Sequence, residues 1–190
     1  MREFSRREIT RFAAAYSLAA TAKLGAAEAM PVRRLGKINF QAGILGLGAQ
    51  YLGDPGVEQS VVDRVVHEAI DGGLNYIDTA PTYNQSEERL GMALKGKRDK
   101  VFLVSKVETN AKGDVMYQLT DSLRKLQTDH LDAVHIHNIS REDRYPSLKQ
   151  VLAEDGTLGA LREAKKQGMI HHIGCTSHMR PARVLPAFET

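Results

Sequence analysis

The sequence predicts an α/β protein built on a parallel sheet, of the TIM (β/α)8 barrel type, and two observations predict it. Short apolar segments alternate with segments of helical periodicity, in units of roughly 30 residues, as parallel strands joined by right-handed crossovers do. Polar side chains follow the carboxyl ends of several apolar segments, where barrels of this type keep their functional residues. The alternation covers about five of the eight units of such a barrel.

The first half of the domain alternates strand and helix twice. The short polar segment 32–40, which contains Gly36, is typical of a hairpin, and GILGLG (43–48) is typical of a buried strand. Valines recur at helical spacing over 61–70, and a pair of glycines ends that helix. LNYID (74–78) then predicts a second buried strand.

The second half continues the alternation. A serine followed by two glutamates is typical of a helix start, so Ser86 is expected to open a helix. Thr157 is expected to cap a later helix, which Gly168 ends, and Pro181 suits the first turn of a last helix. The predicted strands are 101–106, 131–137 and 170–175, and the predicted helices are 86–94, 115–126 and 157–167.

A doubly wound nucleotide-binding sheet is the nearest alternative architecture. It requires G-x-G-x-x-G after the first strand; Gly46 and Gly48 begin that pattern, but Tyr51 stands at the third glycine. The barrel therefore fits better. A complete barrel takes roughly 250 residues. We therefore expect this chain to be a fragment, with completion by a partner or a decayed copy as alternatives.

The composition excludes several functional classes. The 190 residues are 42% hydrophobic and 26% charged, with a formal net charge of +3. This charge is too small to indicate a nucleic-acid partner. The single cysteine, Cys175, excludes an internal disulfide and a metal site built from several cysteines.

The first 29 residues are typical of a twin-arginine export signal. They contain the pair Arg6-Arg7, an Ala-rich stretch too short to span a bilayer, and the small-x-small sequence AEA at 27–29. We predict a signal at 1–29, a domain at 30–190, no stable membrane anchor, and a periplasmic or exported location that involves the twin-arginine machinery. An amphipathic helix packed on a cytoplasmic domain is the alternative.

Four polar residues stand near the carboxyl ends of predicted strands. Asp78 ends one strand and Tyr83 follows it, while Lys106 and His137 end the next two. In a parallel sheet these ends share one mouth. An acid, a phenol, an amine and an imidazole that meet there suit proton transfer to a carbonyl group. Each residue taken alone has a structural alternative, such as a loop cap for Asp78.

Several motifs together resemble the aldo-keto reductase family. The resemblance runs from about Leu35 to the end of the chain, and the motifs occur in the family's order. It implies an NAD(P)H-dependent oxidoreductase that reduces the aldehyde or ketone group of a small molecule to an alcohol, with NADPH favoured over NADH. The motifs are DTAPTY (78–83), SEERLG (86–91), SK (105–106), LDAVHIH (131–137) and QGMIHHIGCTSH (167–178).

The resemblance also assigns roles to residues. Tyr83 would be the general acid, Lys106 paired with Asp78 would favour its phenolate, and His137 would orient the carbonyl oxygen. Thr176 and Ser177 match the family's Ser-Asn pair that holds the nicotinamide carboxamide, although Thr-Ser departs from it, and the segment after the first strand matches the part near the nicotinamide ribose. The cofactor-binding set is then Gly48, Ala49, Gln50, Asp78, Thr176 and Ser177.

Two rival functions remain open. The first is a metal-dependent barrel hydrolase, because such enzymes use H-x-H pairs and His135 and His137 form one. Their pair closes the first strand, whereas this one closes the fourth, so we predict no metal site, although His171, His172 and His178 flank the fifth strand. The second is an exported nucleotide-binding or scaffold protein without turnover, or an inactive fragment.

The polar stretch from 138 to 156 is the one substrate-facing loop that the predicted part of the barrel contains in full. Arg141, Arg144 and Tyr145 in it could meet an anionic or sugar-like substrate. A solvated loop is the expected state of such a stretch.

Overall fold

The computed structural model describes residues 29–179, 182 and 184–188. The predicted export signal lies outside the described residues except for Ala29, and so does Pro181. The chain divides at Met30, and the unit from Pro31 onward is the one described below. In the described residues, no helix combines the length and the apolar character that crossing a membrane requires.

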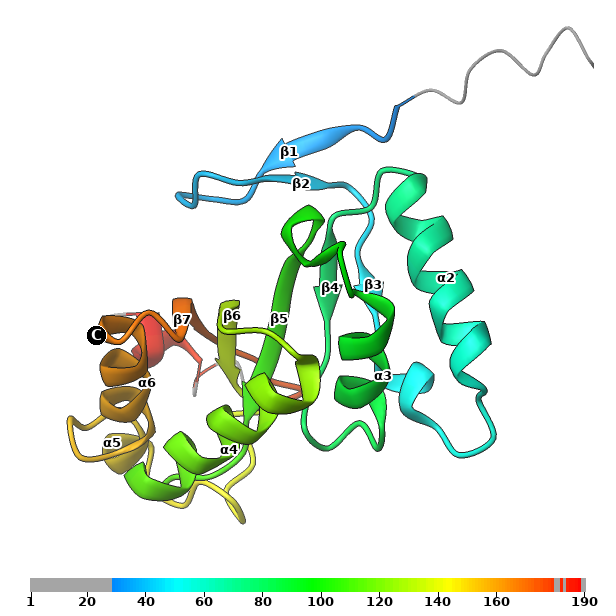
Figure 1. Ribbon diagram of the computed structural model, residues 1–190. Coiled ribbons are helices and arrows are strands. Elements are labelled where there is room, and N and C mark those ends of the chain that lie inside the picture. The colour runs from blue at the N-terminus through cyan, green and yellow to red at the C-terminus, as the bar shows by residue number, and fades with distance from the viewer. Residues whose placement is uncertain (1–28, 180–181, 183, 189–190) are drawn as a thin grey trace, which may run out of the picture. The chain divides into compact units, whose positions relative to one another are not determined.

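A five-stranded parallel sheet organises the domain (Figure 1). Its spatial order, β3-β4-β5-β6-β7, is also the order along the chain, which is the order of strands in a (β/α)8 barrel. The predicted parallel arrangement is therefore confirmed. The strands are Leu47–Gly48 (β3), Tyr76–Asp78 (β4), Phe102–Val107 (β5), Leu131–Ile136 (β6) and Ile170–Cys175 (β7).

A hairpin precedes the sheet and lies across its amino end (Figure 1). It pairs Val32–Arg34 (β1) with Gln41–Gly43 (β2) in antiparallel register. The predicted boundaries were wrong here: the hairpin reaches Gly43, and the expected strand 43–48 shrinks to β3. The apolar run 43–48 did not indicate which of its residues would pair. Of this run, only Leu47 and Gly48 pair with β4.

The hairpin brings its apolar side chains onto the sheet interior. Leu35, Ile38 and Phe40 pack with Tyr76 against a buried cluster of Phe102, Val104 and Ala133. The rings of Phe40 and Phe102 lie 4.9 Å apart between centroids, and those of Tyr76 and Phe102 stack at 5.6 Å. Apolar side chains therefore fill the amino end of this sheet, and we call this set the hairpin core.

Helices follow the strands and cover one face of the sheet (Figure 1). Helix α2 shows how the sequence produces this layer, because its buried residues Val62, Val66 and Ile70 recur every fourth position. Among the residues that the structure describes, the short helix α5 and the 3-10 turns η1 and η2 were not predicted. The helices are Gln59–Asp71 (α2), Ser86–Ala93 (α3), Lys112–Leu126 (α4), Leu148–Val151 (α5) and Thr157–Lys166 (α6), with turns at Gln50–Gly53 (η1), Arg98–Lys100 (η2) and Leu185–Phe188 (η4).

The predicted helix start at Ser86 is confirmed, because α3 begins there, whereas the predicted cap at Thr157 was wrong. Gln85 and Gly156 occupy the cap positions, and the hydroxyls of Ser86 and Thr157 bond to distant loops. Ser86 donates to the carbonyl oxygen of Ala49 at 2.8 Å, and Thr157 donates to that of Thr109 at 2.9 Å. Each hydroxyl therefore ties the start of a helix to a loop that is distant in the sequence.

Candidate active site

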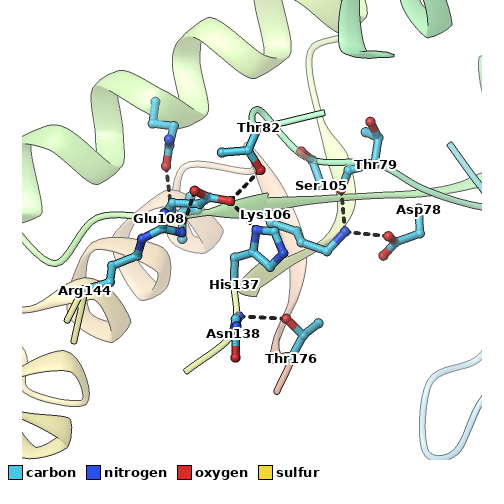
Figure 2. Close-up of polar contacts among 12 residues, drawn as sticks. Asp78, Thr79, Thr82, Ser105, Lys106, Glu108, His137, Asn138, Arg144 and Thr176 are labelled. Atoms are coloured by element: carbon cyan, nitrogen blue, oxygen red, sulfur yellow. Dashed lines mark hydrogen bonds and ion pairs between the residues drawn. The ribbon is translucent and has the colours of Figure 1, made fainter. Parts of the chain in front are cut away.

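The structure brings the four predicted residues together at the carboxyl edge of the sheet, around the ammonium of Lys106. Figure 2 shows Asp78, Lys106 and His137 of this group. The Nζ atom of Lys106 lies 2.5 Å from Oδ1 of Asp78 and 2.7 Å from the carbonyl oxygen of Thr79. It also lies 4.7 Å from the ring centroid of Tyr83. With 4% of the residue exposed, the ammonium is fixed between a carboxylate and a phenol ring.

Tyr83 is held in place by a loop that packs on Gly53. The amide of Gln85 donates to the carbonyl oxygen of Gly53 at 3.2 Å, and the amide of Ser86 donates to that of Tyr83 at 2.9 Å. A Cβ atom on Gly53 would lie 1.8 Å from the carbonyl oxygen of Tyr83. Only glycine fits at residue 53 without displacing the phenol, so Gly53 is a positioning residue that the sequence did not indicate.

His137 follows β6 and faces Tyr83. Its amide donates to the carbonyl oxygen of Val107 at 2.9 Å, which continues the parallel pairing by one residue. The rings of His137 and Tyr83 are nearly perpendicular, at 86°, with centroids 5.9 Å apart. Phenol, ammonium and imidazole therefore share one small space, although their catalytic roles stay predictions.

Glu108 is the functional residue that the sequence reasoning missed. It follows the last residue of β5, and its carboxylate accepts hydrogen bonds from Thr82 at 2.7 Å, from Arg144 at 2.5 Å and from Nδ1 of His137 (Figure 2). Burial raises the pKa of Glu108, but the hydrogen bonds of His137 and Thr82 and the charges of His137 and Arg144 outweigh burial, and the pKa is lowered. Its position just past a strand end, two residues after Lys106, was the available signal.

The loop after β6 is only partly the solvated stretch that we expected: Glu142 and Asp143 are exposed, but two of the three named side chains fold inward. The side chain of Arg144 pairs with Glu108, and Tyr145 is fully buried, with its hydroxyl donating to the carbonyl oxygen of Val107 at 3.2 Å. Burial raises the pKa of Tyr145 well above its usual range. Only Arg141 behaves as expected, at the surface beside Asp143. The loop folds back because Glu108 and Val107 offer it acceptors.

The predicted cofactor residues line the same edge on either side of this centre. Gly48 is in register with Asp78, and a Cβ atom on Gly48 would meet nothing within 4 Å. Ala49 is buried, and Gln50 next to it is exposed. Across the sheet, Thr176 accepts a hydrogen bond from the amide of Asn138 at 2.8 Å.

Ser177, the last of the predicted cofactor residues, donates its hydroxyl to the carbonyl oxygen of Met179. Asn138 itself adopts φ 52°, and its side-chain oxygen accepts from the hydroxyl of Ser140 at 2.7 Å. The turns after β6 and β7 are thus tied to each other. Any role of these hydroxyls toward a cofactor stays a prediction.

The histidines do not gather as the rival metal hypothesis requires. His135 packs beside Gly174, where a Cβ atom would lie 2.6 Å from its ring. Among the described residues, the group whose ligand atoms come within 4.8 Å of one another is His130, Asp132 and His171, near the start of β6 and β7. Asp132 already binds Arg98 at 2.8 Å, and that guanidinium opposes a second cation.

Fold and site together define a barrel-type α/β protein whose strand ends bring together a carboxylate, a phenol, an amine and an imidazole. The family model for the aldo/keto reductase family matches residues 44–185. The chain therefore belongs to the aldo-keto reductase family. Because solved members share its strand and helix arrangement, the fold is that of the family's TIM barrel.

Three relatives illustrate the match. An L-galactose dehydrogenase from Arabidopsis thaliana is 32% identical over 76% of this chain and 48% of its own, and a methylglyoxal reductase from Escherichia coli is 34% identical over 58% and 41%. A Klebsiella pneumoniae aldo/keto reductase solved with NADP and acetate is 31% identical with a TM-score of 0.67, over 79% of this chain and 50% of that one. The chain spans about half the length of the curated relatives it matches.

Proposed function

We propose that this protein is an NAD(P)H-dependent oxidoreductase that interconverts a small aldehyde or ketone and its alcohol. The observation that carries the proposal is the contact of one buried ammonium, that of Lys106, with both the Asp78 carboxylate and the Tyr83 ring. The names of two relatives support it, since one is a reductase of a carbonyl compound and the other a dehydrogenase of a sugar.

The donor set at the carboxyl edge fits a nicotinamide carboxamide. A hydroxyl has one donor and two acceptor lone pairs. Thr176, which accepts from Asn138, keeps its own proton for a ligand, while Ser177, which donates to Met179, keeps acceptor capacity. The open space beside Gly48 leaves room at the other side. We propose NADP as the cofactor, because a related structure was solved with NADP.

In this proposal each residue handles charge or a proton at a defined atom. When bound, the reduced nicotinamide would supply a hydride, which is one proton with two electrons, to the carbonyl carbon. The electron pair of the C=O π bond then becomes an O–H bond with the proton of the Tyr83 hydroxyl, and solvent later returns a proton to the phenolate. The ammonium of Lys106 stabilises that phenolate, and Asp78 and the carbonyl oxygen of Thr79 hold the ammonium still.

Replacement of the proton donor tests the proposal. We expect Tyr83→Phe to lower kcat for reduction of a model aldehyde by about 10²–10⁴-fold, which is the usual contribution of a positioned general acid. NADPH affinity should stay the same. Tyr117→Phe, at a tyrosine exposed on α4, is the matched control and should leave kcat unchanged. Oxidation of NADPH is followed by its absorbance.

Binding of NADPH by the wild-type protein without any aldehyde-dependent oxidation would overturn the proposal. That result would favour the alternative of a nucleotide-binding scaffold. Stoichiometric zinc in the purified protein, with loss of activity on chelation, would instead favour a metal-dependent hydrolase.

We also propose that residues 1–29 direct export through the twin-arginine route, which carries folded proteins. Support comes from the pair Arg6-Arg7 and the AEA sequence at 27–29. An exported reductase needs this route, because its cofactor must be bound before it leaves the cytoplasm. Replacement of both arginines by lysine should retain the protein in the cytoplasm, as measured by cell fractionation. Equal periplasmic amounts of both forms would contradict the proposal.

A further inference from the structure

The carboxylate of Glu108 determines which nitrogen of His137 carries a proton. Thr82, Arg144 and His137 all direct hydrogen-bonding groups at its two oxygens, and 7% of its side chain is exposed. The pKa of Glu108 is lowered, as described above, so the group is an anion at neutral pH. An ionised carboxylate has no proton and can only accept. Nδ1 of His137 must therefore donate.

A neutral imidazole has a single N–H group. If that proton is on Nδ1 and faces Glu108, the other ring nitrogen, Nε2, presents a bare lone pair. No hydrogen bond of Nε2 is found among the described residues, and the ring borders Tyr83. Nε2 is thus the nitrogen that a substrate oxygen would meet. A carbonyl oxygen cannot donate to this lone pair, whereas an alcohol or hemiacetal hydroxyl can.

We propose that Glu108 is a positioning residue that makes neutral His137 a hydrogen-bond acceptor toward substrate, so that the ring favours a hydroxyl-bearing substrate over a carbonyl one. This inference rests on the proposed function, since it assigns the substrate class of the same site. It departs from the role expected from the family resemblance, in which His137 simply orients a carbonyl oxygen.

The charged groups around His137 leave Glu108 as the group that determines which ring nitrogen carries the proton. The ammonium of Lys106 is paired with Asp78, and the guanidinium of Arg144 is paired with Glu108 itself. In the proposed reaction Tyr83 loses and regains its proton. A turnover measurement alone would therefore combine the effect of the Tyr83 proton with that of the His137 proton. The titratable and charged groups that face the ring or its partner are Asp78, Tyr83, Lys106, Glu108, His135, Arg141, Arg144 and Tyr145.

The first test reads the proton directly and needs no turnover. Histidine labelled with ¹⁵N is incorporated into the protein for NMR. The ring signals of His137 are assigned as those that disappear in His137→Asn. At a pH at which the ring is neutral, we expect the wild type to show a protonated Nδ1 and an unprotonated Nε2. A proton on Nε2 would overturn the proposal whether or not the protein reduces aldehydes.

The second test measures binding of benzyl alcohol and benzaldehyde without cofactor, so that neither reacts. At pH 8.5 the wild type should prefer the alcohol by about tenfold, the worth of one hydrogen bond. Glu108→Gln should lose the preference at pH 8.5, because an amide can donate to Nδ1 and release the proton to Nε2.

Asp143→Asn is the matched control, since it removes one carboxylate from the same loop at a side chain that is 64% exposed and paired with Arg141. It should keep the wild-type preference. If Glu108→Gln also keeps it, with the same labelled-ring signals as the wild type, Glu108 is only a structural partner of Arg144 and the proposal is wrong. If the ring signals change as expected and the protein still oxidises no NADPH, the proposed function fails and this inference stands.

Discussion

The two ends of the parallel sheet are built from opposite kinds of side chain. At the amino end, the hairpin core fills the space with rings and branched chains, and Phe102 contacts the rings of Phe40, Tyr76 and His172. At the carboxyl end, buried charges meet in pairs, with Lys106 against Asp78 and Arg144 against Glu108. Apolar burial is favourable by itself, whereas buried charges cost desolvation that their pairing only partly offsets. Stability is therefore expected to come from one end and chemistry from the other.

The largest effect that tests this contrast is at the amino end. Phe102→Ala removes the central ring of the hairpin core, and we expect the free energy of unfolding to fall by about 3–5 kcal/mol. The kcat of the molecules that remain folded should stay near the wild-type value. Urea unfolding measures the first quantity, and Tyr117→Ala, at an exposed aromatic, is the control. A large loss of kcat at full folding would show that the two ends are coupled.

The next effect is at the carboxyl end and acts without any charge. Gly53→Ala forces a Cβ atom against the carbonyl oxygen of Tyr83, so the phenol must shift. A misplacement of about 1 Å typically lowers kcat about 10²-fold. Gly113→Ala, where a Cβ atom would meet nothing within 4 Å, should leave kcat unchanged. Unaltered activity of Gly53→Ala would mean that the position of Tyr83 is not set by this contact.

The smallest effect concerns the buried carboxyl group of Glu87 on α3. Burial raises the pKa of Glu87, which is 1% exposed and accepts from Ser105 at 2.7 Å. The folded state therefore holds a proton that the unfolded state loses, and stability falls as pH rises from the unfolded pKa through the folded pKa. Glu87→Gln, which is always neutral, should raise Tm relative to the wild type more at pH 8 than at pH 4.

Calorimetry at the two pH values measures this difference. Glu68→Gln, on the exposed side of α2, provides the control and should give the same Tm difference at both pH values. A Tm difference for Glu87→Gln that does not change with pH would show that folding does not raise the pKa of Glu87.

Local sequence patterns predicted most of the fold, but they indicated only some of the residues that form the site. Asp78, Lys106 and His137 could be found because each ends an apolar run, and a parallel sheet puts such ends together. Glu108 could not, because its importance depends on a loop that returns from beyond β6 to bring Arg144 to it. Gly53 is similar, since only the three-dimensional path of the Tyr83 loop shows why a side chain is excluded there. Long-range contacts of this kind leave no periodic signal in the chain.

The way Lys106 is held has a consequence for the lifetime of the protein. An aldehyde reacts with a neutral, accessible amine to form a Schiff base. The amine of Lys106 points at a carboxylate and a carbonyl oxygen and is almost wholly covered, so it offers neither a lone pair nor an approach path. Under the proposed function, this burial would protect Lys106 from covalent inactivation by an aldehyde substrate bound beside it.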